Sequence, residues 1–194
     1  MSIGWFVDGA YLGKVWQRCS PSDNLNFLKL RTHIEQELGD TIDEAYYLNA
    51  DPDPSAARTN AFHNALAYPP PTGPGLRVKL YWLSRRPLYW PQSMGGGSVV
   101  HPQTGQQYEL TQQKAVDVGL AFHMVRSHTN RAWTKLALAA GDGDFFEVVQ
   151  YLVEVKNVDL YLIGSMTTIS EELRPYARRI IELGPIASTL TMQP

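Results

Sequence analysis

Four aspartates occupy positions where a carboxylate could bind a cation. Asp8 follows the apolar run "IGWFV", and Asp142 and Asp144 interrupt the apolar stretch "LALAAGDGDFFEVV". Asp117 lies within "VDVGLAFHMV", which is apolar over most of its length. If these carboxylates converge, two of them about 4 Å apart repel by up to about 4 kcal/mol at an effective dielectric constant of about 20. A divalent cation removes that repulsion, and oxygen-only ligands suit Mg²⁺ or Mn²⁺, which activate water for phosphodiester cleavage.

Two of these aspartates also have a structural interpretation from their immediate neighbours. Asp8 precedes a glycine and could simply form a turn. Asp144 is followed three residues later by Glu147, a pattern typical of a capping box at a helix start. If Asp144 is the cap, Asp142 is left without a local structural role.

Asp117 is the most informative of the four. We expect a helix over Thr111–His128 with Thr111 as its N-cap, which places Asp117 beyond the first turn. The helix dipole stabilises a carboxylate within the first turn but not beyond it. The helix is apolar nearly all round, so an ionised Asp117 needs a partner. That partner is either a cation or Lys114, one turn earlier in the predicted helix.

The elements that must position these aspartates alternate between strands and helices. We expect strands at 3–7, 43–50, 76–84, 133–140 and 158–165, and helices at 26–38, 55–67, 111–128, 145–155 and 170–183. This alternation predicts an α/β fold with a mostly parallel sheet, in which ligands lie beyond the carboxyl ends of the strands. Asp8 and Asp142 both follow such an end. The 194 residues fit a single domain, 1–194, with an irregular hairpin or flap at about 85–110, a Pro- and Gly-rich segment.

Composition narrows the class of protein. Hydrophobic residues make up 44% of the chain, enough for a full core, and the net charge of −2 means that any polyanion site must be a local patch. The single cysteine excludes a disulfide framework and suits a reducing cytosol. No segment has the length and apolarity of a membrane span or a signal peptide. We therefore expect a cytoplasmic protein without a membrane partner.

A cluster of basic and aromatic residues suggests where a nucleic acid could bind. Arg85, Arg86 and Trp90 lie together in the predicted flap. Guanidinium groups pair with phosphates and exposed aromatic rings stack on unpaired bases, so this combination favours single-stranded RNA. The alternative is an ordinary solvated rim.

The ordered blocks "FVDGAYL", "KAVDVGLAFHM", "LAAGDGDFFEVV" and "ISEELRPYARRIIEL" resemble the motifs of NYN domains, in particular the LabA/DUF88 group of PIN-like nucleases. The resemblance runs from Phe6 to Leu183. It implies a three-layer α/β/α PIN-like fold and metal-dependent ribonuclease activity. The family's acidic positions correspond to Asp8, Asp117, Asp142 and Asp144.

The chain departs from the family pattern around these acids. Tyr11 stands where the family usually has an asparagine, His123 lies where an acid often follows, and Arg178 replaces an aspartate near the C-terminal end. The four main acids are kept, but their polar surroundings are altered.

The sequence therefore predicts a ribonuclease that uses one or two Mg²⁺ or Mn²⁺ ions held by the four aspartates, with Lys114 as an electrostatic aid. One rival is a catalytically weak or inactive regulatory or RNA-binding module on the same fold. A second is a phosphatase-like domain, which needs a nucleophilic aspartate and a later lysine that the chain does not offer. The sequence leaves open the RNA, the cleavage polarity and whether the protein forms a homo-oligomer.

Overall fold

The computed structural model describes residues 1–57, 60–113 and 115–192. Within these residues, seven strands form one sheet in the order β4-β3-β2-β1-β5-β6-β7. All neighbouring strands are parallel except β3 and β4, which form an antiparallel edge hairpin. The strands are β1 (Ser2–Asp8), β2 (Thr41–Asp51), β3 (Arg77–Pro87), β4 (Glu109–Gln113), β5 (Lys135–Ala139), β6 (Asp159–Gly164) and β7 (Ala177–Glu182).

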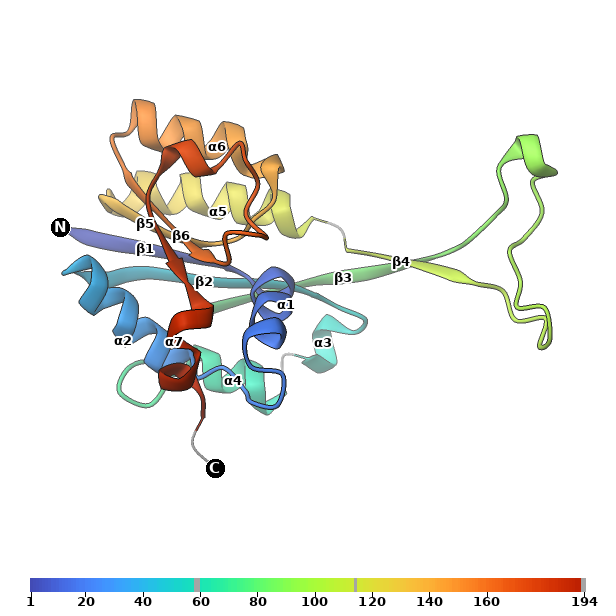
Figure 1. Ribbon diagram of the computed structural model, residues 1–194, viewed down its shortest axis with the longest axis horizontal. Coiled ribbons are helices and arrows are strands. Elements are labelled where there is room, and N and C mark those ends of the chain that lie inside the picture. Colours follow the sequence, from blue (N-terminus) through green and yellow to red (C-terminus); the bar gives the residue numbers. More distant parts are fainter. Residues whose placement is uncertain (58–59, 114, 193–194) are drawn as a thin grey trace.

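Helices cover both faces of the sheet, so the predicted α/β layered fold with a mostly parallel sheet is confirmed (Figure 1). One face carries α1 (Gly9–Cys19), α2 (Phe27–Leu38), α4 (Ala61–Ala67) and α7 (Leu183–Leu190). The other carries α5 (Val116–Arg131) and α6 (Phe146–Gln150). The remaining short helical segments are α3 (Pro54–Ala57), η1 (Gln92–Met94), η2 (Gly143–Phe145), the π-helical η3 (Tyr151–Val155) and η4 (Arg174–Tyr176).

The two faces bury separate apolar clusters. The central strand β1 contributes to both, because side chains alternate across a strand: Trp5 and Val7 pack with α1 and α2, whereas Phe6 packs with α5. All three are fully buried. A central strand covered on both faces has a continuous apolar run, which explains why β1 was recognisable in the sequence and why it ends at the first polar residue, Asp8.

Close backbone packing fixes the position of α5 against the sheet. A Cβ atom added to Gly119 of α5 would lie 2.2 Å from the hydroxyl oxygen of Tyr81 in β3. The glycine therefore lets the start of α5 approach the sheet where the strands end, and the tyrosine fixes how close that approach is.

The predicted flap is present as a long hairpin that projects from the body of the protein (Figure 1). Its stem is regular, with Leu83 paired to Gln113 and Pro87 paired to Glu109. Beyond the stem, isolated bridges join Tyr89 to Ser98 and Val100 to Gln107. The segment from 87 to 108 contains no Lys, Arg, Asp or Glu, so the basic residues of the flap lie in its stem.

Three predicted helices are wrong at their ends or in type. Residues 109–113 form strand β4, and the helix predicted from Thr111 begins only at Val116, because pairing with β3 outweighs local helical preference. The helix predicted at 55–67 is divided into α3 and α4, and Asn60 caps the second. Much of the helix predicted at 170–183 is strand β7, an edge strand whose β-branched Ile180 and Ile181 pair with β6.

Candidate active site

Asp8 lies at the end of β1 and caps α1. Its Oδ1 atom accepts hydrogen bonds from the backbone N–H groups of Ala10, at 2.9 Å, and Tyr11, at 3.1 Å. Burial raises the pKa of Asp8, the two N–H groups oppose that shift, and the negative charge of Asp117 adds to it. Asp8 is therefore a structural cap whose surroundings disfavour its ionised form.

Asp117 lies in the first turn of α5, not beyond it as predicted from the sequence. The residue before the helix is Ala115, which has a positive φ of 65° and offers no side-chain cap. Burial raises the pKa of Asp117, and the charges of Asp142 and Asp144 raise it further. Asp117 is exposed to solvent, but the carboxylates around it disfavour its ionised form even at a helix N-terminus.

Asp142 and Asp144 follow β5 in the loop that leads into α6. The side chain of Asp142 accepts a hydrogen bond from the backbone N–H of Asp144 at 3.1 Å, so Asp142 is the N-cap of this turn. The assignment of Asp144 as the cap is wrong: Asp144 lies within the first turn, and its carboxylate makes no capping bond. Both side chains are exposed.

The structure thus brings all four aspartates to the carboxyl edge of the sheet, with Asp117 as their common neighbour. The charge of Asp117 raises the pKa of Asp8, and the charges of Asp142 and Asp144 raise the pKa of Asp117. Within the described residues, however, no three His, Cys, Asp or Glu side chains are close enough to enclose a metal ion. The donor set is all carboxylate oxygen, which fits a largely hydrated Mg²⁺ or Mn²⁺ held through one or two carboxylates rather than a closed protein cage.

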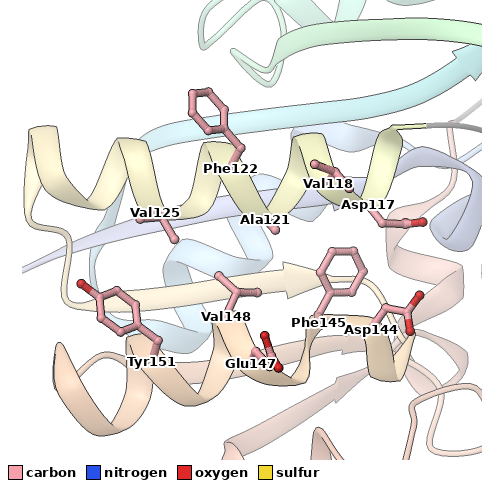
Figure 2. Close-up of a pocket in the computed structure, with 10 residues that line it drawn as sticks. All are labelled: Asp117, Val118, Ala121, Phe122, Val125, Asp144, Phe145, Glu147, Val148 and Tyr151. Atoms are coloured by element: carbon pink, nitrogen blue, oxygen red, sulfur yellow. The ribbon is translucent and has the colours of Figure 1, made fainter.

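A groove of about 640 Å³ runs between α5 and α6 and ends at this carboxylate cluster (Figure 2). Asp117 and Asp144 line one end, and Tyr151 and Val125 line the other. Its walls are mostly apolar, and Phe122 on α5 is 56% exposed. The groove can therefore accept an apolar or aromatic group next to the acidic end.

Two further charged residues near the cluster were missed from the sequence. Lys14 on α1 lies close enough for its charge to lower the pKa of Asp8, although the increase caused by burial is larger. The Oε2 atom of Glu172 would lie 3.0 Å from a Cβ atom added at Gly143, so a fifth carboxylate borders the Asp142–Asp144 loop. Lys14 lies two residues after the end of the first motif, and Glu172 lies inside "ISEELRPY". These positions are the signals that could have identified them.

The residues that depart from the family pattern have distinct positions. Tyr11 donates to or accepts from the Thr168 hydroxyl at 2.9 Å, and its ring touches the space that a Cβ atom would fill at Gly141 or Gly164. It therefore fills the end of the sheet directly behind the cluster. His123 stacks on Tyr46, with ring centroids 4.8 Å apart. Arg178 pairs with Asp159, at the opposite edge of the sheet.

The candidate RNA-binding residues of the flap are exposed. Arg85 and Arg86 lie in the stem, paired with Thr111 and Leu110, and Trp90 is 47% exposed further out. Since β4 ends at Gln113 and α5 begins at Val116, the stem meets the body next to Asp117. Lys114, the predicted electrostatic aid, lies outside the described residues.

No helix among the described residues is long and apolar enough to cross a membrane. Among curated proteins, none is significantly similar to the chain in sequence. Among solved structures, the chain is similar to a protein of unknown function, VPA0982 from Vibrio parahaemolyticus RIMD 2210633, with 18% identity and a TM-score of 0.60. The match covers 94% of this chain and 92% of that one, and at this identity it supports the fold alone. The NYN domain model matches residues 2–184, nearly the whole chain, and the chain therefore belongs to the NYN domain family.

Proposed function

We propose that this NYN domain is a metal-dependent endoribonuclease that cleaves single-stranded RNA. The observation that carries the proposal is the position of Asp117, whose pKa is raised by burial and by two further carboxylates. Structural aspartates are normally placed beside cations or N–H donors, which lower the pKa. Acidic groups that repel one another at a sheet edge are instead typical of a site that a cation completes.

In the proposed mechanism, Asp8, Asp117, Asp142 and Asp144 hold Mg²⁺ or Mn²⁺ at the sheet edge. When bound, the ion supplies Lewis acidity that activates a water molecule and offsets charge on the phosphate. Asp8 and Asp142 are each oriented by backbone N–H groups, so their carboxylates are positioned before the ion binds. Lys14 is the candidate for attracting the substrate phosphate, as is Lys114.

The RNA would approach along the flap stem and the groove between α5 and α6. Arg85 and Arg86 would pair with phosphates, and Trp90 would stack on a base. Phe122, five residues after Asp117 on α5, offers a second exposed ring. Single-stranded RNA fits because an unpaired base can reach the apolar groove while its phosphate stays near the carboxylates. The cytosol, which the single cysteine suits, is the proposed location.

The alternative is a catalytically weak or inactive RNA-binding protein. The observation in its favour is Tyr11, a bulky ring that occupies the space behind the carboxylates where the family usually has an amide. The loose arrangement of the acids points the same way, since no three described metal-binding side chains form a close group.

Cleavage of labelled single-stranded RNA in Mn²⁺ or Mg²⁺, with an EDTA control, tests the proposal. The parent protein should cleave only with metal, and Asp117→Asn should lower the rate by at least about 100-fold, since a bound metal ion contributes several kcal/mol of transition-state charge stabilisation. Asp43→Asn is the matched control, because Asp43 is exposed near the start of β2, at the opposite edge of the sheet. RNA binding without cleavage under all conditions would favour the alternative.

A further inference from the structure

A second concavity lies on the other side of α5, between that helix and strands β2 and β3. Its volume is about 390 Å³, and its lining is almost entirely polar or charged. The charged members and the neighbouring histidine are Glu44, Arg77, Lys79, His123, Arg126 and Arg131. Four cations and one carboxylate give this pocket a net charge of +3 with His123 neutral, in a chain whose net charge is −2.

A buried carboxylate holds two of the cations in place. Glu44 is only 3% exposed. Its Oε2 atom accepts a hydrogen bond from Nη1 of Arg77 at 2.6 Å, and its Oε1 atom lies 3.3 Å from Nε of Arg131. Arg77 also donates to the Tyr46 hydroxyl at 2.8 Å. Because both guanidinium groups are anchored while their side chains stay 53% and 62% exposed, their remaining N–H donors are oriented without being used up.

The other two cations have no such partner. Within the described part of the chain, neither Lys79 nor Arg126 forms an ion pair, and both are exposed. Arg126 lies over the Phe122 ring, 5.7 Å from its centroid. Burial lowers the pKa of His123, and the charges of Lys79, Arg126 and Arg77 lower it further, so three cations act on one point of the pocket. An anion placed there would relieve that repulsion.

The shape and chemistry select the kind of anion. The floor is the stacked pair of Tyr46 and His123, and rigid guanidinium donors surround it. The forked N–H donors of a guanidinium group match the oxygen atoms of a planar carboxylate or a tetrahedral phosphate. A cluster of several cations favours phosphate, which carries more negative charge than a carboxylate. From this geometry we propose that the pocket bounded by Arg77, Lys79, Arg126 and Arg131 binds a phosphate group.

The position of the pocket indicates where that phosphate comes from. Arg126 follows Asp117 on the same helix by nine residues, which is a rise of about 13.5 Å and about two and a half turns, so the pocket lies further along the helix and on its other side. An RNA strand whose scissile phosphate lies at the carboxylates could therefore reach the pocket with another of its phosphates. This source rests on the proposed function; the other source is the phosphate of a free mononucleotide.

Binding measurements in EDTA test the proposal without requiring catalysis. The variant is the double substitution Lys79→Gln with Arg126→Gln, which leaves the Glu44-anchored arginines in place. The matched control is Arg18→Gln with Arg178→Gln, since it removes the same charge from α1 and β7, away from the pocket. Fluorescence anisotropy with labelled single-stranded RNA should show affinity about 10-fold lower for the variant at low salt. The slope of log K against log salt should fall by about 0.7 for each RNA phosphate that the variant no longer neutralises, with the control unchanged.

A second measurement distinguishes the source of the phosphate. The NMR titration of His123 is followed with and without inorganic phosphate or a nucleoside monophosphate, whose binding should raise its pKa in the parent protein and not in the variant. This shift with unchanged RNA affinity would support a phosphate pocket for free nucleotides. Equal RNA losses in variant and control without a phosphate-induced shift of the His123 pKa, or no change in either measurement, would overturn the proposal. Because no step needs metal, a protein that binds RNA here but never cleaves it would refute only the nuclease.

Discussion

Asp8 offers the sharpest separation of structural and metal-binding roles, because Asn and Ala remove different parts of its side chain. Asn keeps an oxygen that can accept the bonds now made from Ala10 and Tyr11, at 2.9 and 3.1 Å, but loses the charge. Ala loses both. Replacing an N-cap residue with Ala costs about 0.5–2 kcal/mol, and two bonds at a half-buried site place Asp8→Ala in the upper part of that range.

In EDTA, Asp8→Ala should therefore lower Tm by roughly 3–8 °C, at about 2–4 °C for each kcal/mol in a chain of this size. Asp8→Asn should leave Tm unchanged or raise it, since it removes the repulsion with Asp117. Both variants should lose the stabilisation that the parent gains from Mn²⁺, which is about 2.7 kcal/mol at 100 times Kd. Thermal melts of the three proteins with Asp43→Asn as control measure all of these effects.

The proposed role of Asp8 is refuted if Asp8→Asn lowers Tm in EDTA by as much as Asp8→Ala does. The negative charge of Asp8 would then be required without metal, and its attraction to Lys14 would outweigh burial and Asp117. Absence of any Mn²⁺ effect in the parent protein would show that the four carboxylates do not form a cation site under these conditions.

Three other measurements probe the carboxylates and the flap stem. Asp117→Asn should raise Tm in EDTA or leave it unchanged and abolish the Mn²⁺ shift, whereas a large loss in EDTA would indicate a hidden ion pair. Replacing Arg85 and Arg86 together with Gln should weaken RNA binding and flatten its salt dependence, and an unchanged slope would assign them to a solvated rim. In acid, the raised pKa of Asp8 makes the folded chain bind its proton more readily than the unfolded chain, whose value is near 3.8. Protonation of Asp8 therefore stabilises the folded chain. This contribution is complete below about pH 3.8 and is lost as pH rises through the raised pKa of Asp8. In denaturant melts over this pH range, the free energy of unfolding should fall less for Asp8→Asn than for the parent protein.

The strand-end positions of Asp8 and Asp142 could be predicted because β1 and β5 are buried runs that end at polar residues. A central parallel strand is apolar on both faces, so its end is visible in the sequence without knowledge of its partners. The projecting flap was visible for a similar reason, since its Pro and Gly residues, which lie between 87 and 105, disfavour regular structure beyond the stem. These features depend on local composition.

The features that could not be predicted depend on partners distant in the sequence. Residues 111–113 favour a helix locally but pair with β3, which moves the start of α5 to Val116 and Asp117 into the first turn. The strand β7 exists only because β6 offers an edge to Ile180 and Ile181. The basic pocket joins β2, β3 and α5, so no single stretch of sequence shows its charge. Long-range pairing therefore decided both the site's electrostatics and the pocket.

The loop after β5 gives a last prediction, in which the corrected cap reverses the expectation from the sequence. Asp142 accepts the backbone N–H of Asp144 at 3.1 Å, whereas the Asp144 carboxylate caps nothing. Both substitutions remove a charge that acts on Asp117, but only Asp142→Ala also removes the cap. Asp142→Ala should therefore cost up to about 1 kcal/mol in EDTA, and Asp144→Ala should cost little or stabilise. Both should still lose the Mn²⁺ response. Urea melts of the two variants in EDTA decide between the assignments: a larger loss for Asp144→Ala would restore it as the cap and leave Asp142 with only its charge.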